Sequence, residues 1–214
     1  MAGIYVLKPA FQRSLSGIER WLVARRVHPD RLTEAALVLS ALGGVSLYFA
    51  PVQPWLLAAV PIVAVVRTAL NALDGMVARD TGLARPWGEV FNELCDRFAD
   101  VSLLGGLALA GPSNLLLGAA AITMMLLSSY LAILNKAAGG RRLYMGPMGK
   151  ADRMVLLAIG APLGFFLPLT WVYNGILAIV LLGCLLTFAR RIQAARDDHD
   201  PSANARASLT PGAS

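Results

Sequence analysis

The stretch NALDGMVARDTGLARPWGEVFNELCDRFAD, residues 71–100, decides the fold because it concentrates charge in a chain that is otherwise apolar. It holds six acidic residues, two asparagines and three arginines, whereas the flanking sequence is mostly Leu, Ala, Val and Gly. Ionisable groups in apolar surroundings are costly unless they face a wet cavity or one another. The stretch therefore raises the question of what surrounds it and what its oxygen atoms bind.

The composition indicates that the surroundings are a membrane. Of the 214 residues, 57% are hydrophobic and 15% are charged, and the mean hydropathy is +0.60. Apolar segments of about the length of a transmembrane helix occur at 32–50, 54–73, 115–134, 154–169 and 175–189, and a sixth, 86–110, is apolar only in its second half. We predict an all-α integral membrane protein with six transmembrane helices, in which the charged stretch joins the second helix to the third.

Basic residues concentrate in alternate loops, whereas the loops PVQP, GPSN and TWVYN between them contain none. Short loops rich in Lys and Arg stay in the cytoplasm, so both termini and the charged stretch are expected on the cytoplasmic side of the cell (inner) membrane. This loop-by-loop distribution also argues against nucleic-acid binding, which favours a single basic stripe.

The two ends of the chain differ from the helical part. The segment IYVLKPAFQRSLSGIERWLVARR mixes apolar and basic residues at helical spacing, which favours an amphipathic helix lying on the membrane surface. The polar C-terminal segment is typical of disorder. We expect a cytoplasmic juxtamembrane amphipathic helix at 1–31, a six-helix transmembrane catalytic domain at 32–194 and a disordered cytoplasmic tail at 195–214.

The polar residues of the charged stretch fall on two helix faces. Spacings of i, i+3, i+4 and i+7 align Asn71, Asp74, Gly75 and Ala78, and spacings of four align Gly88, Asn92, Asp96 and Asp100. Two adjacent helices joined by a short loop can pack so that these two faces point toward each other. Hard oxygen ligands without a His or Cys cluster suit Mg²⁺, Mn²⁺ or Ca²⁺ and argue against zinc.

Phosphate is the substrate group that such a site favours. Mg²⁺ in enzymes usually bridges carboxylates and substrate phosphates, and Arg79 offers a planar fork for a phosphate near Asp74. Pro86 begins a helix whose free amides favour an anion. We interpret the stretch as a metal-dependent phosphate-transfer site. The alternative, a charged cluster that only joins two helices, is disfavoured because polar contacts between membrane helices normally use one or two groups.

At these residues the chain resembles the CDP-alcohol phosphotransferase family, whose signature is D-x2-D-G-x2-A-R-x8-G-x3-D-x3-D. Every spacing is intact and six of the eight signature positions match, while Asn71 and Asn92 replace the first and third aspartates. The resemblance implies a membrane enzyme, commonly a homodimer, that transfers a phosphatidyl-type group from a CDP-linked lipid such as CDP-diacylglycerol to an alcohol and releases CMP. Direct attack on the β-phosphate is preferred to a covalent intermediate.

The resemblance also implies residue roles. The ligands of Mg²⁺ or Mn²⁺ would be Asn71, Asp74, Asn92 and Asp96. The CDP site would comprise Asp74, Gly75, Ala78, Arg79 and Gly88. Asp96 would be the general base that accepts the proton of the attacking hydroxyl.

Each asparagine keeps a ligand oxygen but removes a negative charge, so we expect a weaker metal site, or one fewer tightly held ion without substrate. Glu89, Glu93 and Asp100 on the next helix are candidates to compensate for the lost charge. Basic residues that would bind a phosphorylated acceptor are Arg67, Arg141, Arg142, Lys150, Arg153, Arg190 and Arg191. Except for Arg67, which is too deep in its helix, these residues also fit the alternative that they only set the membrane orientation.

Serine, glycerol phosphate, inositol phosphate, an amino alcohol and another lipid all remain open as acceptors. Two other kinds of protein also stay open: a catalytically disabled relative that acts as a lipid- or nucleotide-binding membrane scaffold, and a transporter. A transporter would usually show broken helices in corresponding halves of the chain, and none is clear in this sequence. Release of CMP from CDP-diacylglycerol in the presence of metal and an alcohol separates these possibilities.

Overall fold

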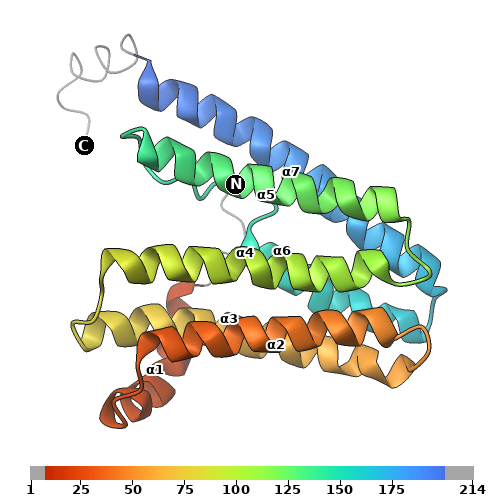
Figure 1. Ribbon diagram of the computed structural model, residues 1–214, viewed down its shortest axis with the longest axis horizontal. Coiled ribbons are helices and arrows are strands. Elements are labelled where there is room, and N and C mark those ends of the chain that lie inside the picture. Colours follow the sequence, from red (N-terminus) through yellow and green to blue (C-terminus); the bar gives the residue numbers. More distant parts are fainter. Residues whose placement is uncertain (1–7, 201–214) are drawn as a thin grey trace.

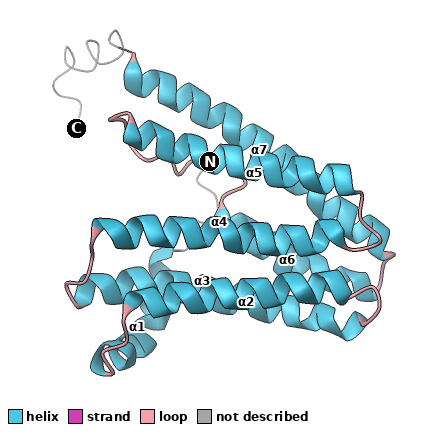
Figure 2. Cartoon of the chain, in the orientation of Figure 1, coloured by secondary structure: helices cyan, strands magenta, loops and turns pink. Residues whose placement is uncertain are grey.

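The structure is a computed structural model that describes residues 8–200, and within this range its regular elements are helices without any strand (Figures 1 and 2). The α-helices are α1 (Lys8–Ala24), α2 (Pro29–Phe49), α3 (Ala59–Asp80), α4 (Pro86–Leu109), α5 (Leu115–Ala137), α6 (Lys150–Gly160) and α7 (Leu169–His199). Two short 3-10 helices are η2 (Pro54–Ala58) and η3 (Ala161–Phe165). The all-α prediction is confirmed for this range, and the predictions for residues 1–7 and 201–214 lie outside it.

Between residues 8 and 200, four helical segments are long and apolar enough to cross a membrane, namely Pro29–Phe49, Pro54–Asp80, Leu115–Ala137 and Leu169–His199. These segments make the chain an integral membrane protein. The other two predicted spans correspond to α4, which has 24 residues but carries five charged side chains, and to α6 with η3. With only 11 residues, α6 is about 16 Å long, roughly half the apolar thickness of a bilayer.

The packing of α2 on α4 depends on two glycines. A Cβ atom added to Gly44 would lie 2.1 Å from the Ser102 carbonyl oxygen, and one added to Gly106 would lie 2.0 Å from the Gly44 carbonyl oxygen. Small residues let helix backbones approach closely inside a membrane. Figure 1 shows α2, α3 and α4 side by side, with α5 and α7 as a second, inclined pair. This packing fixes α4, which carries half of the charged stretch.

The loop between α5 and α6 is anchored to α7. Gly146 has a φ of 123°, a left-handed conformation that favours glycine. A Cβ atom on Gly146 would also lie 2.3 Å from Thr187 Cγ2. The amide of Met148 donates a hydrogen bond of 3.1 Å to Thr187 Oγ1. These contacts place the start of α6, and with it Lys150, against the middle of α4.

The two outer helices are also tied to the bundle. Leu15 and Leu22 of α1 are buried against Leu73 and Val77 of α3. The last helix, α7, continues to His199, so the beginning of the tail predicted from residue 195 is helical. The physical reason is visible in Asp198, whose carboxylate accepts a hydrogen bond from Asn135 and pairs with Arg141 at 2.9 Å.

Candidate functional site

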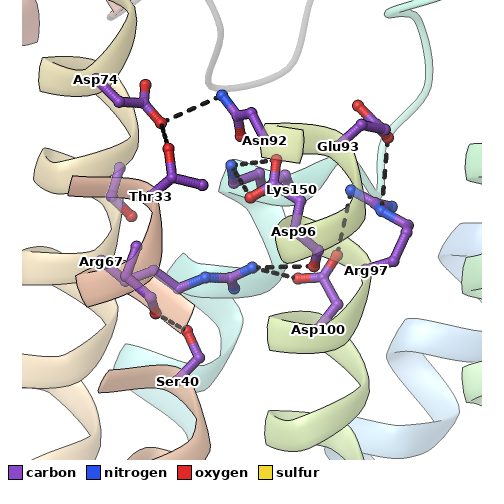
Figure 3. Close-up of polar contacts among 12 residues, drawn as sticks. Thr33, Ser40, Arg67, Asp74, Asn92, Glu93, Asp96, Arg97, Asp100 and Lys150 are labelled. Atoms are coloured by element: carbon purple, nitrogen blue, oxygen red, sulfur yellow. Dashed lines mark hydrogen bonds and ion pairs between the residues drawn. The ribbon is translucent and has the colours of Figure 1, made fainter. Parts of the chain in front are cut away.

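Two residues of the charged stretch, the buried Asp74 and the half-buried Asn92, meet between α3 and α4, as Figure 3 shows. One carboxylate oxygen of Asp74 accepts hydrogen bonds from the side-chain amide of Asn92, at 3.2 Å, and from the hydroxyl of Thr33 on α2, at 2.9 Å. The side chains at these two signature positions therefore point toward one another, as their helical spacing predicts. Thr33 adds a third helix to the site.

Asp96 lies one turn further along α4 and is paired with the first residue of α6. The ammonium of Lys150 lies 2.5 and 2.6 Å from the two carboxylate oxygens of Asp96 (Figure 3). Asp96 is 8% exposed and lines a cavity, so its carboxylate is accessible to a small molecule from that side. This position suits a group that must accept a proton from a bound substrate.

The two asparagines carry unsatisfied polar atoms. Asn92 Oδ1 and Asn71 Nδ2 are buried and have no hydrogen-bond partner within residues 8–200. Rotation of a carboxamide exchanges its oxygen and nitrogen, so each asparagine can present an oxygen to a cation. In the same range, no group of three or more His, Cys, Asp or Glu side chains could hold a metal ion. The residues therefore fit a hard divalent cation only if carboxamide oxygens join the carboxylate of Asp74.

The four other residues expected at the CDP site lie on the α3–α4 hairpin. Gly75, Ala78 and Gly88 are partly exposed, and Arg79 is exposed. Among residues 8–200, a Cβ atom added to Gly75 would meet only the Arg79 guanidinium, at 3.4 Å, and one on Gly88 would meet only the Arg85 side chain, at 3.5 Å. Because glycine weakens a helix by about 0.5–1 kcal/mol relative to alanine, packing within the chain does not explain either residue. Both leave open space where a ligand can approach the backbone.

A cavity of about 270 Å³ opens beside Asp96. The charged side chains that line it are Glu93, Asp96, Arg97, Arg142, Lys150, Arg153 and Arg191. Basic groups outnumber acidic ones, so the cavity suits an anion. Four of the seven basic residues predicted to bind the acceptor line this cavity, and Arg67, Arg141 and Arg190 do not.

Arg191 differs from the other arginines of this cavity. It is 8% exposed, and its guanidinium donates hydrogen bonds to the carbonyl oxygens of Ser128, at 2.6 Å, and Met145, at 3.1 Å. No carboxylate in residues 8–200 forms an ion pair with it. A buried cation without a counterion is costly, and an anion bound in the cavity would reduce that cost.

Asp100, a candidate to restore negative charge at the metal site, is more deeply buried than Asp96 and pairs with arginines instead. Its carboxylate pairs with Arg67 at 2.8 Å and with Arg153 at 2.6 Å, and the Asp100 and Arg67 side chains have no exposed surface. Arg67 therefore balances a carboxylate. The other two candidates, Glu89 and Glu93, both pair with Arg142, and Glu89 also pairs with Lys136.

Several residues of the site are missing from the sequence prediction. Arg97 belongs to the charged stretch but lies off the predicted helix face, and it contacts the hydroxyl of Ser129 on α5. Ser128 also lines the cavity, with its hydroxyl unpaired within the described residues. The sequence signal for Arg97 is a cation inside an apolar helix, which needs a partner. Thr33 and Ser129 give no such signal.

Comparisons with known proteins agree with this geometry. The model of a family described as CDP-alcohol phosphatidyltransferase matches residues 26–190. The inner membrane protein YnbA of Escherichia coli is 36% identical over 156 residues, covering 73% of this chain and 77% of that protein. The phosphatidylinositol phosphate synthase of Mycolicibacterium smegmatis is 26% identical over 92% of this chain and 90% of its own length.

Solved structures share the fold. The phosphatidylinositol phosphate synthase of Mycobacterium tuberculosis with CDP-DAG bound aligns with a TM-score of 0.73 at 20% identity, covering 94% of this chain and all of that chain. The same enzyme in complex with manganese and citrate aligns with a TM-score of 0.72 at 20% identity, covering 92% of both chains. The helical arrangement is therefore that of a known membrane enzyme.

Proposed function

We propose a phosphorylated alcohol as the acceptor of this chain, which belongs to the CDP-alcohol phosphatidyltransferase family and so transfers a phosphatidyl group from a CDP-linked lipid to an alcohol. The other product is CMP. The observation that carries the proposal is the cavity beside Asp96, where Arg191 is buried without a counterion among residues 8–200. The relative from Mycolicibacterium smegmatis is named for a lipid that keeps a phosphate on its headgroup, which also supports this choice.

The donor and the acceptor would approach Asp96 from different sides. The CDP moiety would lie along the α3–α4 hairpin, where Gly75 and Gly88 leave space and Arg79 can bind a phosphate. The acceptor phosphate would bind the arginines of the cavity, which places its hydroxyl near Asp96. Holding both substrates in this geometry removes much of the entropic cost of their reaction.

Asp96 would then act as the general base. The acceptor oxygen forms a bond to the β-phosphorus of the donor as its proton passes to the Asp96 carboxylate. The bond between that phosphorus and the bridging oxygen breaks, and CMP leaves with the electron pair. A Mg²⁺ or Mn²⁺ ion held by Asp74 and the side-chain oxygens of Asn71 and Asn92 would neutralise negative charge on the pyrophosphate. Manganese in the Mycobacterium tuberculosis structure supports this choice of metal.

The membrane arrangement extends the same proposal. In this proposal α4 crosses the membrane inside the bundle, and so do α6 and η3 together. The chain would then cross the membrane six times, and α1 would lie on the membrane surface. The basic loops support an orientation with both termini and the active site on the cytoplasmic side. The family resemblance further supports a homodimer. Accessibility labelling of single cysteines tests the orientation, and the mass of the protein in lipid nanodiscs tests the dimer.

The main experiment measures CMP release by the purified chain in nanodiscs with CDP-diacylglycerol and Mg²⁺ or Mn²⁺. The acceptor panel pairs each phosphorylated alcohol with its unphosphorylated form, for example inositol phosphate with inositol and glycerol phosphate with glycerol. We expect turnover with a phosphorylated member only. Faster turnover with the unphosphorylated partner would contradict the proposed acceptor, and absence of CMP with every acceptor would favour the disabled scaffold.

Arg191→Gln provides a direct test of the acceptor site. Glutamine keeps hydrogen-bond donors but removes the charge, so we expect the KM for the acceptor to rise about 10- to 100-fold, the loss of one charged hydrogen bond. The KM for CDP-diacylglycerol should change little. The matched control is Arg190→Gln, because Arg190 is exposed and does not line the cavity. An equal effect of both variants would show that positive charge near the membrane matters, rather than this cavity.

Gly75→Ala provides the corresponding test of the donor site. Alanine favours the helix by up to about 1 kcal/mol, so the free energy of unfolding should not fall. If CDP lies against this backbone, the added methyl group should raise the KM for CDP-diacylglycerol about tenfold or more. Gly105→Ala is the control, since a Cβ atom there meets nothing within 4 Å in the described part of the chain and lies far along α4. An unchanged donor KM in Gly75→Ala would remove Gly75 from the CDP site.

A further inference from the structure

The ammonium of Lys150 lies directly beside the carboxylate of Asp96. The ammonium lies 2.5 Å from one Asp96 oxygen and 2.6 Å from the other, so both oxygens already contact a cation. Lys150 is the first residue of α6, and the loop before it is anchored on α7 through Thr187. The position of this charge is therefore built into the fold.

The remaining oxygen ligands lie on the other side of the site, around Asp74. Asn92 donates to the Asp74 carboxylate with its amide nitrogen, which leaves its own oxygen buried and without a partner in the described residues. The buried amide nitrogen of Asn71 is likewise unpaired in that part of the chain. One carboxylate and two carboxamides are enough for one hard cation but supply only a single negative charge.

The net charge of the site also favours a single divalent ion. Relative to a signature of four aspartates, Asn71 and Asn92 remove two negative charges, which is the charge of one divalent ion. Of the two carboxylates that remain, Asp96 is matched by Lys150, and Asp74 has no cationic partner among the ion pairs of residues 8–200. A second divalent ion would therefore lie among two neutral amides and an ammonium, which opposes its binding.

We infer that Lys150 is a built-in cation that takes the place of a metal ion at Asp96, so that this chain binds one divalent ion, at Asp74, Asn71 and Asn92. The inference rests on the proposed function and specifies its metal requirement. Lys150 is then a positioning residue for Asp96 rather than a ligand of the acceptor phosphate. A catalytic site with fewer negative charges would keep the same fold and use a lysine where another site uses a metal.

The test is a titration of the full chain in nanodiscs with Mn²⁺, in which EPR reports free Mn²⁺. We expect one bound ion per wild-type chain. Lys150→Met should tighten Mn²⁺ binding about tenfold or more, because it removes a positive charge next to the site. Lys150→Met combined with Asn71→Asp and Asn92→Asp should bind a second ion. Lys150→Arg, which keeps the charge, should behave as wild type.

Lys136→Met is the matched control, since Lys136 is half exposed and pairs with Glu89, at 2.5 Å, whereas Lys150 pairs with Asp96. The inference is overturned if the wild-type chain binds two Mn²⁺ ions or none, or if Lys150→Met and Lys136→Met give the same affinity. The wild-type stoichiometry decides this even if a Lys150 variant does not fold. CMP release measured on the same samples separates the outcomes: release with two bound ions rejects only the inference, and no release with any acceptor rejects the proposed function.

Discussion

We expect Asp96→Asn to lower the rate of CMP release at saturating substrates by at least about 100-fold, the lower end of the effect of removing a general base. Asparagine has almost the same shape, and its oxygen can still accept a hydrogen bond from Lys150, which lies 2.5 Å from Asp96. The chain should therefore fold and still bind CDP-diacylglycerol. The measurement is single-turnover CMP release together with donor binding.

A matched control for this experiment is Asp80→Asn. Asp80 belongs to the same charged stretch but is exposed at the end of α3 and does not line the cavity. We expect its rate to stay within about twofold of wild type, as is usual for surface substitutions away from the site. If Asp96→Asn turns over at the wild-type rate, Asp96 is not the base, and the family role assigned to this position does not apply to this chain.

The helices of the described region were largely predictable because apolar runs and helix breaks are local properties. The segment 154–169 differs from a single long helix for a physical reason. In that segment, α6 ends at Gly160 and a 3-10 helix with Pro162 follows, so the chain does not form one straight span. The sequence prediction weighed hydropathy and did not weigh the helix-breaking Gly and Pro residues in the same run.

The candidate site was predictable only where helical spacing governs it. A period of 3.6 residues places Asp74 and Asn92 on faces that can meet, and the structure brings them within hydrogen-bond distance. The lysine at Asp96 comes from another helix, 54 residues along the chain. Among many basic residues in cytoplasmic loops, no local pattern distinguishes the one that reaches into the site.

The role of Asp100 was also not predictable from helical spacing. On the helix face Asp100 follows Asp96 by one turn, which made it a candidate to supply charge to the metal. Whether it turns toward the metal or away depends on where cations from other helices lie. Arg67 and Arg153, from α3 and α6, both form ion pairs with it. A sequence without a known fold does not reveal such a three-helix contact.

This contact leads to the largest expected effect on stability. We expect Asp100→Asn to lower the free energy of unfolding by about 3–5 kcal/mol, the usual loss when one partner of a buried ion pair is removed. Asp100 is the shared counterion of Arg67 and Arg153, whose side chains are 0% and 4% exposed, so its loss leaves two buried cations uncompensated. Unfolding in lipid and detergent mixtures, followed by circular dichroism, measures the change.

The order of three variants makes this test specific to the buried cluster. Arg67→Met removes one cation but leaves the pair of Asp100 with Arg153 intact, so its loss should be smaller than that of Asp100→Asn. Glu89→Gln removes a half-exposed ion pair with Lys136 and should cost roughly 0–1 kcal/mol. If Asp100→Asn were as stable as wild type but bound Mn²⁺ more weakly, Asp100 would serve the metal after all. The expected order would instead show that Asp100 holds α3, α4 and α6 together. The position of Asp96 depends on that packing.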